Sequence, residues 1–168
     1  VRAIDGVTLC PLGPLTNIAT ALQKAPDIAP RIREIVLMGG AYFAVGNITP
    51  SAEFNIYVDP EAADIVFKSG VPITVMPLDI THKALTTQPR VDAFRNMGTP
   101  VGEAVAAWTD FLNRLDMEKY ASTGAPLHEP CAICYLIDPA LCIGRQVQVC
   151  AATAVDLHPR MTVPGRGG

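Results

Sequence analysis

The sequence predicts an α/β fold with an open, mainly parallel sheet flanked by helices. Three short apolar runs rich in β-branched residues alternate with helical patterns over the first half of the chain. Each run stops at or near a proline or glycine, which is typical of buried strands. The order strand, helix, strand, helix, strand indicates βαβ units, and such units place their strands in parallel.

The first half contains five expected elements and a short helical turn. Val7–Cys10 is a buried strand that ends at Pro11. Apolar residues at helical spacing, among them Leu15, Ile18 and Leu22, predict the first helix. Asp59 is expected to cap the second helix, which begins with a proline. The expected strands are 7–10, 34–38 and 73–76, the helices are 15–24 and 60–69, and the turn lies within 29–33.

The second half is expected to be mainly helical. Its expected helices are 91–96, 102–117 and 130–137, followed by a strand at 146–155. The longest helix carries an apolar stripe made of Val105, Trp108, Phe111, Leu112 and Leu115. A tryptophan on such a stripe is more often a core residue than a stacking platform, so we expect Trp108 to be buried. No internal repeat is visible.

Composition excludes several classes of protein. The chain has 168 residues, 49% hydrophobic and 17% charged, which favours a single well-packed domain. A net charge of −3 without any run of lysine or arginine argues against nucleic-acid binding. There is neither a membrane-length apolar segment nor a signal-peptide pattern. Five cysteines, mostly within apolar runs, predict reduced thiols in the cytoplasm, and the Cys131-x-x-Cys134 pair lacks a second pair to complete a zinc site.

A polar loop between Gly39 and Pro60 is the first candidate site. It contains Asn47, Glu53 and Asn55, and an extended backbone would direct the last two to one face, with Phe54 directed away. A carboxylate that accepts hydrogen bonds, next to an amide that also donates them, suits a sugar diol. The alternative is an ordinary polar surface loop. The loop follows a parallel strand, however, and ligands bind at the carboxyl ends of such strands.

His128 and Glu129, at the expected start of a helix, form the second candidate site. The imidazole could donate a proton, and the carboxylate could bind a metal ion. The alternative for Glu129 is purely structural, since a carboxylate in the first turn stabilises the helix dipole.

Six segments together resemble the inosine–uridine-preferring nucleoside hydrolases, in that family's order and at its spacing. They are Leu12–Ala19 (LGPLTNIA), Val36–Gly40 (VLMGG), Gly46–Asn55 with its GN and AEFN motifs, Asp59–Ala63 (DPEAA), Leu78–His82 (LDITH) and His128–Ala132 (HEPCA). None of these motifs would be specific alone. The resemblance covers nearly the whole chain and implies the nucleoside hydrolase fold.

The resemblance also implies an activity, which is hydrolysis of the N-glycosidic bond of ribonucleosides to ribose and free base. It implies that Asn47, Glu53 and Asn55 hold the ribose hydroxyls and that Met38 lines the sugar pocket. His128 would be the catalytic residue that protonates or contacts the leaving base.

A calcium cofactor is implied as well. Glu129 stands where the family has a calcium-binding aspartate, and the backbone carbonyl of Leu12 matches another family ligand. The aspartate-rich motif that supplies most ligands and the general base has no match in this chain. We therefore expect residues 1–168 to be the middle and later part of one nucleoside hydrolase domain, incomplete at the N-terminus and at the C-terminus.

These inferences lead to two hypotheses. In the first, the full-length parent is a calcium-dependent, cytoplasmic ribonucleoside hydrolase that forms a dimer or tetramer, with no nucleic-acid or membrane partner. In the second, this polypeptide alone is an inactive fragment or ribose-binding remnant. A divergent member that works without calcium is a third option, which the glutamate at position 129 permits.

Overall fold

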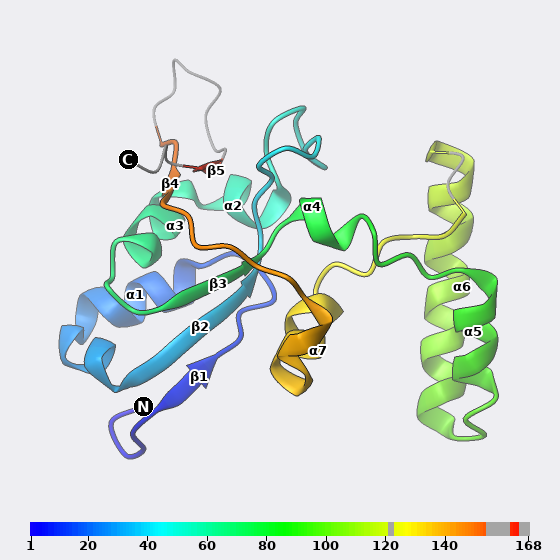
Figure 1. The fold of residues 1–168 in the computed structure, drawn as a ribbon, viewed down its shortest axis with the longest axis horizontal. Helices are drawn as coiled ribbons and strands as arrows, with labels where there is room; N and C mark the ends of the chain where they lie inside the picture. Colours follow the sequence, from blue (N-terminus) through cyan, green and yellow to red (C-terminus); the bar gives the residue numbers. More distant parts are fainter. Residues whose placement is uncertain (121–122, 154–161, 165–168) are drawn as a thin grey trace. The chain divides into compact units, whose positions relative to one another are not determined.

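The computed structural model describes residues 1–120, 123–153 and 162–164, with side chains for residues 1–114 and 123–153. It divides into two compact units (Figure 1). The first, here called the sheet unit, comprises Val1–Ile80 and His128–Gly168. The second, the helical unit, comprises Thr81–Leu127.

The sheet unit contains three parallel strands in the order β1-β2-β3, as the sequence predicts. Its elements are β1 (Val7–Leu9), α1 (Thr16–Lys24), the 3-10 helix η1 (Pro26–Arg31), β2 (Ile32–Met38), α2 (Phe54–Val58), α3 (Pro60–Phe67), β3 (Ile73–Met76), α4 (Leu78–Thr81), α7 (Pro130–Ile137), η2 (Pro139–Leu141), β4 (Val149–Ala151) and β5 (Thr162–Pro164). The central strand β2 is buried along most of its length because it has a neighbour on each side.

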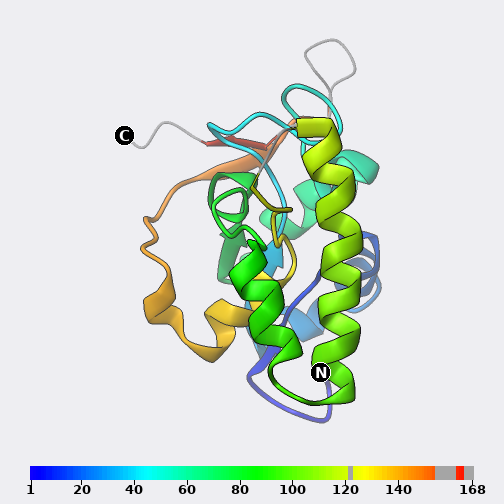
Figure 2. The ribbon, with the colours of Figure 1, turned by 90° about the vertical axis from the view of Figure 1, so that its right-hand side faces the viewer.

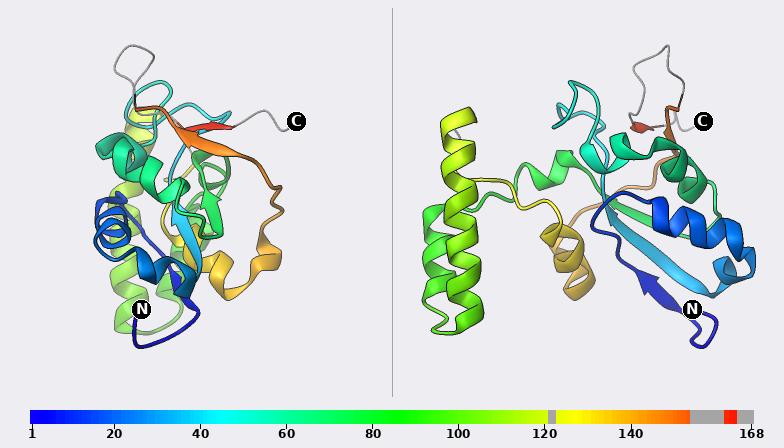
Figure 3. Two further views of the ribbon diagram at one scale, coloured as in Figure 1. Left: turned by 90° about the vertical axis from the view of Figure 1, so that its left-hand side faces the viewer. Right: turned by 180° about the vertical axis from the view of Figure 1, so that it is seen from behind.

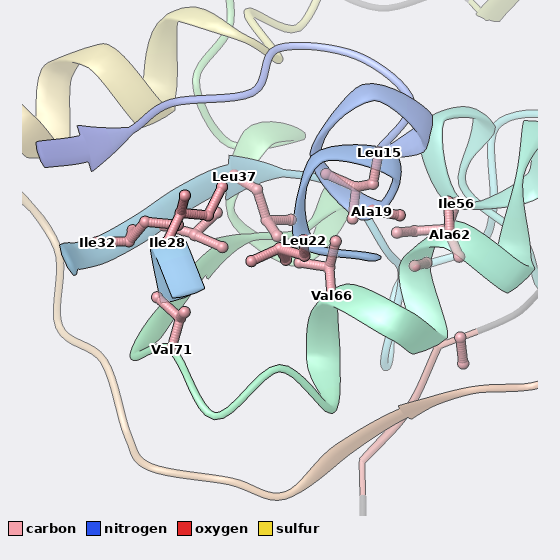
Figure 4. Packing of buried hydrophobic residues seen from close by; sticks show 13 residues of the cluster. Leu15, Ala19, Leu22, Ile28, Ile32, Leu37, Ile56, Ala62, Val66 and Val71 are labelled. Carbon is pink, nitrogen blue, oxygen red and sulfur yellow. The ribbon is translucent and has the colours of Figure 1, made fainter. Parts of the chain in front are cut away.

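Helices cover both faces of this sheet. Ile35 and Leu37 of β2 pack in one cluster with residues of α1 and α3, whereas Val36 packs in another with residues of α7. The left-hand view of Figure 3 shows the sheet between these layers, and Figure 4 shows the larger cluster. The alternation follows from the two-residue period of a strand. Each fully buried aliphatic side chain contributes about 1.5–3 kcal/mol, so this core fixes the strand ends that carry the candidate site.

Asp59 caps α3, as predicted, and also ties α3 to α1. One carboxylate oxygen accepts a hydrogen bond of 3.0 Å from the backbone N–H of Ala62. The other accepts one from the Thr16 hydroxyl, at the start of α1. A single carboxylate thus satisfies one helix N-terminus and sets its position against a second helix.

The strand expected at 146–155 is shorter than predicted. Only Val149–Ala151 form β4, which pairs antiparallel with β5, and residues 154 and 155 lie outside the described residues. The β1-β2-β3 sheet is wholly parallel, so the prediction of a mainly parallel fold is confirmed.

The helical unit is built on α5 (Gln88–Arg95) and α6 (Pro100–Tyr120), which lie side by side (Figure 2). An ion pair between Arg95 and Asp110 joins them. The prediction that Trp108 is buried is wrong, because its side chain is 69% exposed, and its neighbours Phe111 and Leu112 are also exposed. The stripe therefore faces outward along this part of α6, and the side chain of Leu115 lies outside the described residues.

A buried polar cluster closes the two ends of the helical unit. The Thr86 hydroxyl donates to the Asn113 side-chain oxygen at 2.7 Å and lies 2.8 Å from the Ala125 carbonyl. The Asn113 amide donates to the Thr86 carbonyl at 2.7 Å, and the backbone N–H of Ala125 donates to the Asn113 side-chain oxygen at 2.6 Å. The segment entering the unit is thereby held beside the segment leaving it.

Among the described residues, no helix has both the length and the apolar character needed to cross a membrane.

Candidate active site

The candidate site lies at the carboxyl ends of the parallel strands. Met38 is the last residue of β2, and the loop from Gly39 to Glu53 leaves this end and leads into α2. Leu12 follows β1 and Asp79 follows β3 at the same edge. The predicted position of the loop relative to the sheet is therefore confirmed.

Glu53 organises the whole loop from a buried position. Its side chain is the N-cap of α2, with one oxygen accepting the backbone N–H of Asn55 at 2.8 Å and the other accepting those of Gly40 at 3.0 Å and Ile56 at 3.2 Å. The residue is only 2% exposed. Burial raises the pKa of Glu53, the negative charge of Glu129 adds to that rise, and the three N–H groups oppose it.

The expectation that Glu53 and Asn55 share an extended segment is wrong. Glu53 is extended, with φ −89° and ψ 144°, but Asn55 lies in the first turn of α2. A capping residue is followed at once by helical residues, and sequence spacing alone does not distinguish this geometry from a strand. Phe54 does face away, as predicted, and is 48% exposed.

Asn55 and Met38 contact each other although Asn55 is helical. The Asn55 amide donates to the Met38 carbonyl at 3.3 Å and to the Met38 sulfur at 3.4 Å. Both residues are buried, at 5% and 1% exposed. The Glu53 carboxylate, the Asn55 amide and Met38 therefore meet at the end of β2.

Asn47 lies at the exposed part of the loop, where its side-chain oxygen accepts the Phe54 N–H at 2.9 Å. That bond leaves the amide nitrogen as the group that can donate to a ligand. The loop around Asn47 is tight. A Cβ at Gly46 would lie 2.2 Å from the Thr49 carbonyl oxygen, and Gly40 has φ +82°, so both positions require glycine.

Asp79 is a functional candidate that the sequence analysis missed. Its carboxylate accepts hydrogen bonds from three consecutive N–H groups, those of Tyr42, Phe43 and Ala44. Partial burial acts to raise the pKa of Asp79, but these N–H groups outweigh it, and the pKa lies below its usual value. The available signal was an aspartate three residues beyond β3, at the edge where the polar loop begins.

His128 and Glu129 stand at the start of α7, where both are half-buried. Glu129 is the N-cap residue of α7 but has helical φ and ψ, and its side chain makes no capping hydrogen bond. Ala132 of α7 packs in one cluster with Val36 of β2. The charge of Glu129 also contributes to the raised pKa of Glu53. The structure thus brings the two ends of the candidate site, which are far apart in the sequence, to one region.

The residues expected to hold calcium form only part of a metal site. The Glu129 carboxylate makes no capping hydrogen bond to α7. Carboxylate and carbonyl oxygens are ligands that calcium prefers. Leu12, 43% exposed, follows β1 at the same sheet edge. Across the described ranges, however, no three His, Cys, Asp or Glu residues gather as a metal-binding group. The donors fit a calcium ion in kind but do not enclose one.

The structure thus places a buried carboxylate and a buried amide at the carboxyl edge of a parallel sheet, where ligands bind in many α/β proteins. The chain belongs to the family described as inosine-uridine preferring nucleoside hydrolase, whose profile matches residues 1–166. Enzymes of this family generally depend on a metal ion.

Relatives and solved structures agree with this assignment. The chain is 48% identical over 161 residues to the pyrimidine-specific ribonucleoside hydrolase RihA of Shewanella sp. strain ANA-3, covering 95% of this chain and 50% of that protein. Among solved structures, it is similar to a purine-preferring ribonucleoside hydrolase from Gardnerella vaginalis, with a TM-score of 0.87 and 36% identity. It is also similar to the plant nucleoside hydrolase PpNRh1, with a TM-score of 0.89 and 32% identity. Each structural match covers 95% of this chain and 50% of the other.

The chain thus spans about half the length of the relatives it matches. The predicted family and fold class are confirmed.

Proposed function

We propose that the full-length protein hydrolyses the N-glycosidic bond of ribonucleosides, releasing ribose and a free base. The observation that carries this proposal is the buried Glu53 carboxylate, fixed beside Asn55 and Met38 at the end of β2. Membership of the nucleoside hydrolase family supports the reaction class. On this proposal, residues 1–168 belong to a single nucleoside hydrolase domain.

Asn47, Glu53 and Asn55 bind the ribose hydroxyls in this proposal. Glu53 accepts hydrogen bonds, whereas the two amides can both donate and accept. Three backbone N–H groups hold Glu53 in place before the sugar arrives, so little reorganisation is needed on binding. Met38, next to Asn55, forms the apolar wall of the sugar pocket.

Glu53 also acts on the transition state. Glycosidic cleavage passes through an oxocarbenium-like sugar that carries positive charge. A fixed carboxylate in a water-poor site stabilises that charge more strongly than it stabilises the neutral substrate. Glu53 therefore contributes to the rate as well as to sugar binding.

His128 serves the leaving group. A half-buried imidazole at the start of α7, one residue from Glu129, can supply or relay a proton to the departing base. The base leaves more easily as a neutral molecule than as an anion, so this proton lowers the barrier.

Glu129 and the Leu12 carbonyl are the residues of this chain that would hold calcium. When bound, the ion would orient a water molecule and lower its pKa. The Glu129 carboxylate makes no capping hydrogen bond, which supports this role, although glutamate is one methylene longer than aspartate. The remaining ligands and the general base would come from an aspartate-rich segment of the full-length protein.

Two further parts of the proposal concern the setting of the enzyme. None of the five cysteines, all of them among the described residues, forms a disulfide in the structure, which supports a reducing compartment such as the cytoplasm. The exposed apolar residues Val101, Trp108 and Phe111 of α6 support assembly of the full-length protein into a dimer or tetramer. Light scattering on the full-length protein measures that state.

The test is an assay of the full-length protein with uridine, cytidine, inosine and adenosine, with ribose release as the readout. Both base classes belong in the panel because similar proteins include a pyrimidine-specific and a purine-preferring enzyme. We expect Glu53→Gln to lower kcat/KM by roughly 100- to 1,000-fold, since hydrogen bonds to a charged group are each worth about 1.5–3 kcal/mol.

The matched control is Glu61→Gln, which changes an exposed glutamate in the first turn of α3. It should leave ribose release unchanged. Equal activity of Glu53→Gln and wild type on every nucleoside would contradict the assignment of Glu53. A wild-type protein that cleaves none of the four would contradict the proposed function itself.

For the 168 residues taken alone, an inactive or weakly ribose-binding fragment is the second candidate. The observation that favours it is the lack of a three-ligand metal group within the described part of the chain. Calorimetry of the isolated chain with calcium and ribose, with an assay of nucleoside cleavage, distinguishes the two, because tight calcium binding with cleavage would exclude the fragment hypothesis.

A further inference from the structure

The loop that carries Asn47 is held by two different carboxylates. Glu53, at the C-terminal end of the loop, accepts the N–H of Gly40 at its start, and Asn47 accepts the Phe54 N–H. In the N-terminal part of the loop, Asp79 is the second carboxylate acceptor. Its Oδ2 lies 2.9 Å from the Tyr42 nitrogen, and its Oδ1 lies 2.8 Å and 3.1 Å from the nitrogens of Phe43 and Ala44.

Asp79 is itself well placed to act as an anchor. It belongs to α4, which begins two residues after β3 ends. The N–H of the preceding residue, Leu78, donates to the Gly40 carbonyl at 2.9 Å, and Leu78 is fully buried. The aspartate therefore extends from rigid backbone toward a loop that has little core of its own, since Phe43 and Val45 are exposed.

The carboxylate gives the N-terminal part of the loop an acceptor that backbone alone does not supply there. Three consecutive N–H groups that converge on one point form a concave anion site, and the two oxygens of the Asp79 carboxylate satisfy all three. Hydrogen bonds to a charged acceptor are about twice as strong as neutral ones. Ala44 is three residues from Asn47, so the position of the Asn47 amide depends on this anchor.

We propose that Asp79 is a positioning residue for the ribose site, which holds residues 42–44 so that Asn47 is presented to the sugar. The inference rests on the proposed function for its link to ribose. The anchoring of the loop itself stands on the geometry alone.

The experiment uses Asp79→Asn and Asp79→Ala in the full-length protein, with Asp27→Asn as the control. Asp27 is exposed and pairs with Arg2, far from the loop in sequence. The Asn variant keeps the size of the side chain but presents an N–H₂ group to backbone donors. KM for the best ribonucleoside should rise roughly 10- to 100-fold in both variants, with a smaller change in kcat, because a misplacement of about 1 Å costs up to about 100-fold.

A second readout is hydrogen exchange at the amides of residues 42–44. Their exchange should accelerate in both Asp79 variants and stay unchanged in the control. A purely structural aspartate would lower overall stability without this local effect or the rise in KM. An active enzyme with unchanged KM and unchanged exchange in the Asp79→Asn variant would overturn the proposal. Failure of wild type to cleave any ribonucleoside would overturn the proposed function, whereas accelerated exchange would still confirm the anchor.

Discussion

The two halves of the candidate site differ in how much of their geometry the chain supplies by itself. In the loop from Gly39 to Glu53, the carboxylate of Glu53 is buried and accepts hydrogen bonds from three backbone N–H groups. At the start of α7, Glu129 is half-buried and its side chain makes no capping hydrogen bond. The first region is preorganised by its own backbone, whereas the Glu129 carboxylate of the second makes no capping hydrogen bond. On the proposed function, residues 1–168 thus fix the sugar-binding side of the site but supply only part of its metal-binding side.

After Glu53→Gln, the largest effect is expected from Gly46→Ala, which would break the preorganised half. An added Cβ would lie 2.2 Å from the Thr49 carbonyl oxygen and 2.3 Å from that of Ala52, so the loop backbone must move. We expect kcat/KM of the full-length protein to fall by roughly 100-fold, given the sensitivity of catalysis to positioning. Gly144→Ala, where a Cβ meets nothing within 4 Å, is the control. Comparable activity of the two variants would show that the loop is not preorganised.

The second prediction concerns the half that needs an external group. Glu129→Gln should weaken calcium binding by the full-length protein roughly 10- to 100-fold, a range known for altered metal surroundings. The melting temperature without calcium should hardly change, because Glu129 makes no capping bond. Calorimetric titration with calcium measures the first quantity and thermal unfolding the second. Glu103→Gln, an exposed first-turn change in α6, serves as the control. Unaltered calcium affinity in Glu129→Gln would remove Glu129 from the metal site.

Asn113→Ala tests whether the helical unit depends on its own polar cluster. Removing the side chain leaves the Thr86 carbonyl and the Ala125 N–H without their partner in a buried setting. Each buried unsatisfied group costs about 1–3 kcal/mol, so for these two groups we expect a loss of about 2–6 kcal/mol in the free energy of unfolding, measured by denaturant titration. Gln88→Ala, on the exposed side of α5, should cost less than about 0.5 kcal/mol. Equal losses of unfolding free energy in Asn113→Ala and Gln88→Ala would show that the polar cluster does not stabilise the helical unit.

The smallest expected effect is a pH dependence from Asp79. Its pKa is lower in the folded protein than in an unfolded chain, so its contribution to stability is present above the unfolded pKa of about 3.9. That contribution is lost as the pH falls through the folded value. Melting temperatures between pH 7 and pH 3 should therefore drop more steeply for wild type than for Asp79→Asn. Parallel curves of melting temperature against pH for wild type and Asp79→Asn would contradict a lowered pKa of Asp79.

The sequence could predict most of the fold because apolar runs and their stops are local signals. Strand β3 was predicted at 73–76, and the capping role of Asp59 was also predicted. The helical position of Asn55 could not be predicted, because a cap followed by one turn has the same residue pattern as a short extended segment. The exposure of Trp108 was missed because an amphipathic stripe reveals a face but not whether anything covers it.

The candidate site was predictable in its residue types and less so in its contacts. Glu53 and Met38 were predicted as site residues, and the structure brings them to the end of one strand. The role of Asp79 depends on contacts between residues about 35 positions apart, which a single sequence does not encode in its spacing. The effect of the Glu129 charge on the pKa of Glu53 likewise depends on the packing of α7 against the sheet.

The hydrogen bonds that join the two ends of the helical unit have a consequence for how the sequence of this unit can vary among related proteins. The backbone N–H groups of Thr86 and Leu127 donate to the carbonyls of Ala125 and Ala84, both at 2.9 Å, so the chain leaves beside the point where it entered. A segment closed in this way can be lengthened, shortened or exchanged with little effect on the β1-β2-β3 ladder. Lineages that share the loop from Gly39 to Glu53 could therefore diversify the segment between residues 87 and 124 independently, in the manner of an exchangeable cassette.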